Sequence, residues 1–179
     1  RSGGRTIKEI ITTINARCDQ ALLDGSAKPP VDEIHILAHF AADAFYRVVI
    51  SGKQGLHGIT RAMLTFPHCR DLQECGCLAL GNLCTQNNNL VVADQAGCIQ
   101  AIITAMRVHS SSVAVQSAAC EALRNLSGLI LAYAKYPPSP IVTDLVTVLS
   151  HTNNMCLIPV HRQIADTFLM LLKQTVKKI

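Results

Sequence analysis

The sequence predicts an all-α protein built from stacked helical repeats, and two observations carry that prediction. The first is an internal repeat, because LQECGCLALGNL at 72–83 returns as VQSAACEALRNL at 115–126, so that Asn82 recurs 43 residues later as Asn125. The second is helical spacing of apolar residues between breaks rich in glycine and proline. A repeat of this size cannot bury its apolar face alone, so neighbouring repeats must stack to form the core.

The length of the repeat narrows the fold class further. Tetratricopeptide and ankyrin units recur at about 34 and 33 residues, whereas armadillo and HEAT units recur at about 40 to 47. Residues 87–103, NNNLVVADQAGCIQAII, resemble the first helix, glycine bend and second helix of an armadillo repeat. The resemblance to armadillo-repeat proteins is close over 55–127, moderate beyond and weak before residue 44. It implies a right-handed superhelical solenoid of about three to four repeats with irregular ends.

The domain organisation that we expect is a single armadillo-like domain over residues 1–179. Irregular helices or a partial repeat would fill 1–54, two well-matched repeat cores 55–127, and a divergent capping repeat 128–179. In the first part, apolar spacing predicts one helix over 6–23 and either one long helix or two over 31–50. If there are two, residues 45–54 match the short first helix of the next repeat.

Each central repeat is expected to hold a second helix, a turn and a third helix. The second helices are predicted at 56–66 and 98–108, and the turns at 67–70 and 109–112. Asp71, followed three residues later by Glu74, predicts an N-cap with a capping-box partner for the first of the third helices. Beyond residue 128 we expect helical segments at 129–136, 141–149 and 156–175, with a proline break at 137–140 and a turn at 150–154.

The resemblance also implies a binding surface. In armadillo proteins the third helices line a concave groove, where a recurrent asparagine hydrogen-bonds the backbone of an extended peptide, and an amide suits that task because it donates and accepts. A structural role, in which each asparagine ties down its own helix end and the following loop, stays open. The tryptophan found in members that bind nuclear-import signals is absent, so we expect no such binding. The candidate partner-binding residues are Leu78, Gly81, Asn82, Glu121, Arg124 and Asn125.

Composition restricts the classes of partner. Only 16% of residues are charged and the mean hydropathy is +0.28, so apolar surface meets either a partner or neighbouring repeats. The net charge of +4 is spread thinly except at the lysine-rich tail, and there is no tryptophan for bases to stack on, so nucleic acid is not expected. No apolar run approaches the roughly 18 residues of a membrane span, which argues against an integral membrane protein.

Cysteine and histidine usage predicts neither a disulfide framework nor a metal site. The eight cysteines fall mainly at apolar helical positions, which indicates a reducing intracellular compartment, with the cytoplasm favoured and an organelle still open. His68, Cys69, Cys75 and Cys77 include soft ligands, but Cys75 and Cys77 point to different sides of a helix. His35 and His39 form a second, weaker candidate pair. No phosphate loop, nucleophile elbow or paired-carboxylate signature accompanies them, so we expect no catalytic residue and no cofactor.

The function that these patterns favour is a non-catalytic protein–protein interaction scaffold, as a structural or adaptor subunit of a larger assembly. Two alternatives remain: a regulatory module that binds extended peptides through its groove, and a fragment of a larger multidomain protein. A start at Arg1 without methionine or signal peptide favours a processed product or a piece of a longer chain. A zinc- or thiol-dependent activity around residues 69–84 is the least favoured reading.

Overall fold

The computed structural model describes residues 5–134, 140–155, 163, 166 and 169–170, and this part of the chain contains helices and no strands. The all-α prediction is confirmed. The helices are α1 (Ile7–Asp24), α2 (Val31–Phe40), α3 (Ala44–Gly52), α4 (Gly55–Thr65), α5 (Arg70–Leu83), α6 (Asn89–Gln95), α7 (Cys98–Val108), α8 (Val113–Asn125), α9 (Ser127–Ala134) and α10 (Pro140–Met155).

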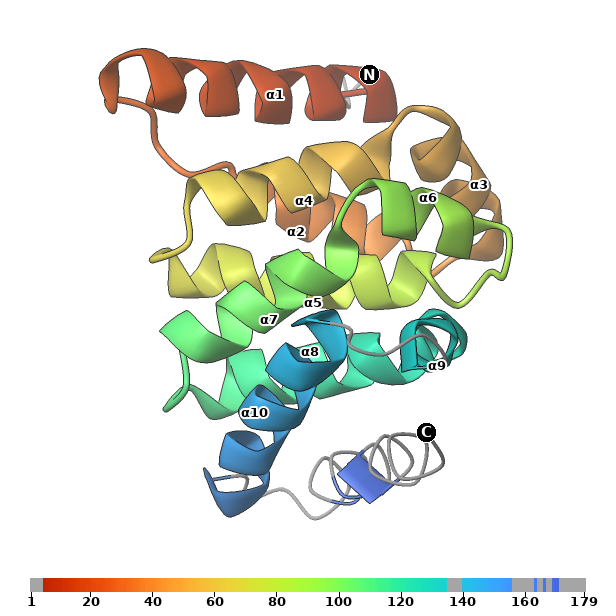
Figure 1. Ribbon diagram of the computed structural model, residues 1–179. Helices are drawn as coiled ribbons and strands as arrows, with labels where there is room; N and C mark the ends of the chain where they lie inside the picture. The colour runs from red at the N-terminus through yellow and green to blue at the C-terminus, as the bar shows by residue number, and fades with distance from the viewer. Residues whose placement is uncertain (1–4, 135–139, 156–162, 164–165, 167–168, 171–179) are drawn as a thin grey trace.

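The helices are arranged in rows (Figure 1). Successive members of one row pack on each other in the order α1, α4, α7, α10, and a second row runs α2, α5, α8. The short helices α3, α6 and α9 lie along one edge, each beside the long helix that follows it. The core lies between the two long rows, and its largest fully buried side chains include Ile14, Leu37, Ile59, Leu80 and Ile102.

The first two helices occupy the same places as the long helices of the later units, since α1 packs on α4 and α2 packs on α5. Thr6 and Glu9 cap α1 reciprocally: the Thr6 hydroxyl accepts from the Glu9 N–H, and the Glu9 carboxylate accepts from the Thr6 N–H at 2.7 Å. Residues 31–50 form two helices, α2 and α3, and the Asp43 carboxylate accepts from the Phe45 N–H to begin the second. The two-helix alternative is therefore confirmed.

Two local predictions are wrong. The helix α5 begins at Arg70 with Cys69 as its N-cap, because the Cys69 carbonyl accepts the first helical hydrogen bond, from the Gln73 N–H at 3.0 Å. Asp71 therefore lies inside the first turn and pairs with Arg70. The turn expected at 150–154 is instead part of α10, where the Ser150 hydroxyl donates to the Val146 carbonyl and no glycine or proline ends the helix. The helix expected at 156–175 falls almost wholly outside the described residues.

Each central unit contains a buried glutamine that joins its two long helices. The Gln73 amide on α5 donates to the Met63 carbonyl at 2.9 Å and to the Phe66 carbonyl at 3.0 Å. The Met63 carbonyl has no ordinary helical partner, because the residue four positions on is Pro67, which has no N–H. In the next unit Gln116 donates in the same way to the Met106 and His109 carbonyls, at 2.8 and 3.1 Å.

A buried carboxylate fastens α1 to α2. The Glu33 side chain is 2% exposed, and one of its oxygens accepts from Arg5 at 2.7 Å and from Arg17 at 3.2 Å. Burial raises the pKa of this carboxyl, but the hydrogen bond from Arg5 and the charges of Arg17 and Arg5 outweigh it, so the pKa of Glu33 is lowered overall. Folding therefore favours the ionised form.

We expect Glu33→Gln to lower the free energy of unfolding by about 1–2 kcal/mol at pH 7. A lowered folded pKa gives stability that is present above the unfolded pKa and lost as the pH falls through the folded pKa. The difference between parent and variant should therefore shrink below the usual carboxyl value of 4.5. Urea unfolding at several pH values measures it, with the surface change Glu74→Gln as control. A difference that stays constant down to pH 3 would contradict the ion-pair account.

Candidate partner-binding groove

The row α2, α5, α8 presents one face built from pairs of residues at i and i+4. Leu78 and Asn82 form the pair on α5, and Glu121 and Asn125 form the pair on α8, 43 residues further on. Counting 43 residues back places His35 and His39 on α2, and both side chains are exposed. The register of the row thus extends to the first unit, with histidine in the place of asparagine.

The two asparagines connect successive helices of this row. Asn82 Nδ2 donates to the Ala38 carbonyl of α2 at 3.2 Å, and Asn125 Nδ2 donates to the Gly81 carbonyl of α5 at 3.0 Å. Both carbonyls lie in the last turn of their helix, where backbone acceptors have no intrahelical partner. The amides therefore cap the preceding unit's helix, and not their own helix end as the structural alternative supposed.

These bonds leave part of each amide available. Asn82 and Asn125 are half-buried, and within the described residues the only side-chain hydrogen bond of each is the one to the preceding helix. An asparagine amide offers two N–H donors and an oxygen with two lone pairs. One donor is used for packing, which leaves a donor and the acceptor for a peptide backbone laid along the row.

The remaining groove candidates divide between surface and interior. Leu78 is 42% exposed, and Glu121 forms an ion pair with Arg124 one turn along α8. Gly81 is buried between helices, because a Cβ added there would lie 3.1 Å from the Cα of Ala122. Five of the six candidates thus reach the surface of the row, whereas Gly81 sets the close approach of α5 to α8.

The charge of this row differs from that of the whole chain. No lysine occurs in α2, α5 or α8, and the two arginines, Arg70 and Arg124, are each ion-paired with a carboxylate of their own helix. Asp32 and Glu74 carry no ion pair with the described residues. The row is therefore acidic although the chain as a whole carries +4.

Four cysteines in or next to α5 and α7 have thiols whose pKa is raised by burial. Burial raises the pKa of Cys75 and of Cys77, and it raises the pKa of Cys84 to about 12 and of Cys98 to about 11, the last partly offset by a hydrogen bond with Thr60. A nucleophilic cysteine needs a lowered pKa. In the part of the chain that the structure describes, no three histidine, cysteine, aspartate or glutamate side chains gather closely enough to hold a metal ion.

Comparison with protein-family models identifies one of the helical units. The model of the armadillo/beta-catenin-like repeat matches residues 87–128, the stretch that carries α6, α7 and α8. Residues 87–128 form an armadillo repeat. No curated protein and no solved structure matches the chain. The armadillo repeat is typically a non-enzymatic, protein-binding unit, and the matched stretch includes the candidate residues Glu121, Arg124 and Asn125.

Several residues that join the helices of this chain were missed by sequence reasoning. Gln73 and Gln116 stand at equivalent places in the two copies of the repeat, so their recurrence was the signal that could have found them. His109 contacts the preceding turn through a hydrogen bond of 2.8 Å with the Pro67 carbonyl, a link between units that composition does not reveal.

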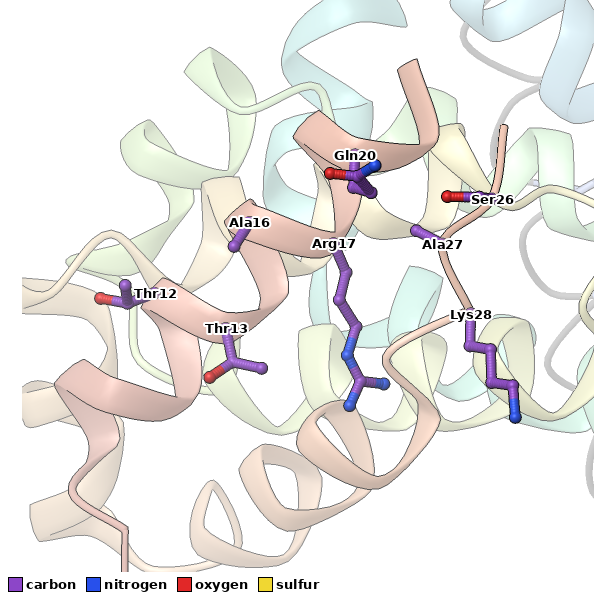
Figure 2. A pocket seen from close by; sticks show the side chains of 8 residues that line it. All are labelled: Thr12, Thr13, Ala16, Arg17, Gln20, Ser26, Ala27 and Lys28. Carbon is purple, nitrogen blue, oxygen red and sulfur yellow. The ribbon is translucent and has the colours of Figure 1, made fainter. Parts of the chain in front are cut away.

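A shallow hollow of about 510 Å³ lies between α1 and the loop that leads to α2. Figure 2 shows the Arg17 side chain extending from α1 beside this loop. That guanidinium is already occupied, because it donates to Glu33 and, at 3.3 Å, to the Pro29 carbonyl. The hollow is lined by Thr12, Thr13, Ala16, Arg17, Gln20, Ser26, Ala27 and Lys28.

In the described ranges no single helix is both long and apolar enough to cross a bilayer. The pair α6 and α7 passes by length and composition together but is bent by 63°. The buried residues of α7 include Ile99, Ile102 and Met106, which face the protein core.

Proposed function

We propose that this armadillo-repeat protein is a non-catalytic scaffold for protein–protein interaction, acting as a structural or adaptor subunit of a larger assembly. The row α2, α5, α8 serves as its partner-binding groove, with Leu78, Asn82, Glu121, Arg124 and Asn125 at the contact surface. The observation that carries the proposal concerns the side-chain amides of Asn82 and Asn125. Each amide donates one N–H to a carbonyl of the preceding helix and keeps a second N–H and its oxygen for a partner.

The proposal extends to the whole chain and its setting. Residues 1–179 form a single right-handed superhelical domain, in which α1 and α2 act as a first unit and residues 128–179 as a divergent last one. The row contacts and the repeat match support this arrangement. The largely buried cysteines favour a reducing compartment such as the cytoplasm.

Exposed apolar side chains favour the permanent-subunit form of the proposal. Phe45, Val48 and Val91 are 62–70% exposed on α3 and α6, along the edge of the stack. Neighbouring exposed apolar side chains, such as Phe45 and Val48 one turn apart on α3, are typical of a surface that a partner covers. A reversible, peptide-binding module is the second candidate, favoured by the amides of the groove.

Native mass spectrometry of the complex purified gently from the natural source separates these two forms. A permanent subunit should bring a fixed complement, close to one copy for each copy of this chain, that survives high salt. A substoichiometric, salt-labile set of partners would favour the reversible module. Recovery of the bare chain alone under both conditions would contradict both forms.

We expect Asn82→Ala combined with Asn125→Ala to abolish or strongly weaken partner binding and to lower the free energy of unfolding by about 1 kcal/mol for each amide. The stability loss follows from the two interhelical bonds. The matched control is His109→Ala, which removes a bond between units away from the groove. Binding is measured by calorimetry and stability by urea unfolding. Retention of full partner affinity by the double variant would limit the amides to a structural role.

A further inference from the structure

Aromatic side chains gather at one corner of the molecule, at the junction of α2 and α3. Phe40 and Tyr46 are stacked with ring centroids 4.7 Å apart, and Phe45 meets Tyr46 edge-on at 5.4 Å. The His39 ring lies 6.3 Å from Phe40. Phe45 is 70% exposed and Tyr46 36%. The chain has only four phenylalanines and three tyrosines, so three of these seven rings meet in one exposed cluster, which we call the aromatic corner.

One carboxylate lies beside the aromatic corner, and the neighbouring Arg47 is held by backbone carbonyls. The Asp43 carboxylate lies at the start of α3, where one oxygen accepts from the Phe45 N–H at 2.7 Å. Asp32 is exposed at the other end of α2, eight residues before Phe40. Arg47 donates to the Ala41 and Ala42 carbonyls, both at 3.0 Å, and so stabilises the end of α2.

The aromatic corner is continuous with the groove. Asn82 binds the carbonyl of Ala38, the residue directly before His39. Gln86 donates to the Ala44 carbonyl at 3.4 Å, which holds the loop after α5 against the start of α3. An extended segment that lies along the row would therefore reach the corner after it passes Asn82.

We propose that the aromatic corner binds an arginine or lysine side chain of an extended partner segment, and this rests on the proposed function of the groove. A cation stacks on an exposed aromatic face, arginine best of all because its guanidinium is planar. Asp43 supplies the opposite charge at the corner, and the helices of the row that leads to it contain no lysine. An apolar anchor residue would pack against the rings but would leave the Asp43 carboxylate without an opposite charge.

The test uses an acetylated and amidated peptide of alternating glycine and arginine, nine residues long, and two matched peptides with citrulline or leucine in place of arginine. Citrulline keeps the shape of arginine and removes its charge. The ring-proton NMR signals of Phe45 and Tyr46 should shift on titration with the arginine peptide. We expect the citrulline peptide to bind about threefold to tenfold more weakly.

Protein variants complete the test. Phe45→Leu keeps an apolar side chain and removes the ring, and Asp43→Asn keeps an N-capping group and removes the charge. Each should weaken binding of the arginine peptide about threefold to tenfold. The control Leu64→Ala changes an exposed side chain on α4, away from the corner, and should leave binding unchanged.

The outcomes separate the corner from the groove. Equal binding of the arginine and citrulline peptides, or unchanged binding by Phe45→Leu, would overturn the cation proposal, and a preference for the leucine peptide would assign the corner to an apolar anchor. If the arginine peptide shifts signals of α5 and α8 but not of Phe45 and Tyr46, the groove stands and the corner falls. If it shifts neither set, the cationic ligand is wrong, and the groove is decided by the asparagine variants alone.

Discussion

Replacing Gln73 by alanine is expected to lower the free energy of unfolding by about 3 kcal/mol. The Gln73 side chain is buried on α5, and its amide donates to the carbonyls of Met63 and Phe66 at the end of α4. These two hydrogen bonds join the two helices. Alanine would leave the Met63 carbonyl without a donor in the described structure and open a cavity. Chemical unfolding followed by circular dichroism measures the loss.

Two further variants identify the cause of that loss. Gln73→Leu restores most of the side-chain volume but not the donor, so it should remain destabilised by about 2 kcal/mol if the hydrogen bonds dominate. Gln100→Ala removes an exposed glutamine from α7 and should change stability by less than about 0.5 kcal/mol. Full recovery in Gln73→Leu would show that packing, and not the amide, is what the site requires.

Gly81→Val is expected to lower the free energy of unfolding by about 3 kcal/mol and to disturb the groove. A Cβ at this position would lie 3.1 Å from the Cα and 3.4 Å from the Cβ of Ala122. Backbone cannot move aside as a flexible side chain can, so α5 and α8 would have to separate. The Asn125 bond to the Gly81 carbonyl crosses the same contact and should weaken with it.

The matched control for Gly81 is Gly52→Ala, since an added Cβ at Gly52 meets nothing within 4 Å. This variant should be neutral or slightly stabilised, because alanine has the higher helix propensity. Urea unfolding and an NMR comparison of the Asn125 side-chain amide in both variants measure the two effects. A Gly81→Val protein as stable as the parent would show that the two helices separate at little cost.

Periodicity and repetition predicted the long helices well. Apolar spacing predicted helices at 6–23 and 98–108, which the structure confirms as α1 and α7. Each of these helices buries one face, and apolar residues three and four positions apart in the sequence fall on that one face of a helix. The armadillo resemblance of residues 87–103 is likewise confirmed by the repeat match.

Contacts between units could not be predicted from the sequence. The partners of Asn82 and Asn125 lie 44 residues earlier, and their acceptors are backbone carbonyls, which no residue type marks. Gly81 was expected in the groove because it neighbours Asn82, but helix rotation directs it at Ala122. The choice between one and two helices over 31–50 depended on Asp43, whose carboxylate accepts from the Phe45 N–H and begins a second helix. The sequence does not show whether that hydrogen bond forms.

The equivalence of α2 to the later helices α5 and α8 could not be predicted for a different reason. The helix α2 carries His35 and His39 where the later units carry Leu78 with Asn82 and Glu121 with Asn125. Many different residues can maintain the apolar spacing of a helix. The helix α2 therefore keeps its packing position although its sequence no longer resembles the later copies of the repeat. Only the contacts of α2 with α5 reveal the equivalence.

The asparagine bonds also give the stack a direction. Each runs from a later unit to a carbonyl of the unit before it, from Asn82 to Ala38 and from Asn125 to Gly81. Synthesis releases the chain from its N-terminus, so every acceptor helix leaves the ribosome before the amide that will cap it. Each new unit can therefore dock on a surface that is already complete, and the protein can assemble in the order in which it is translated.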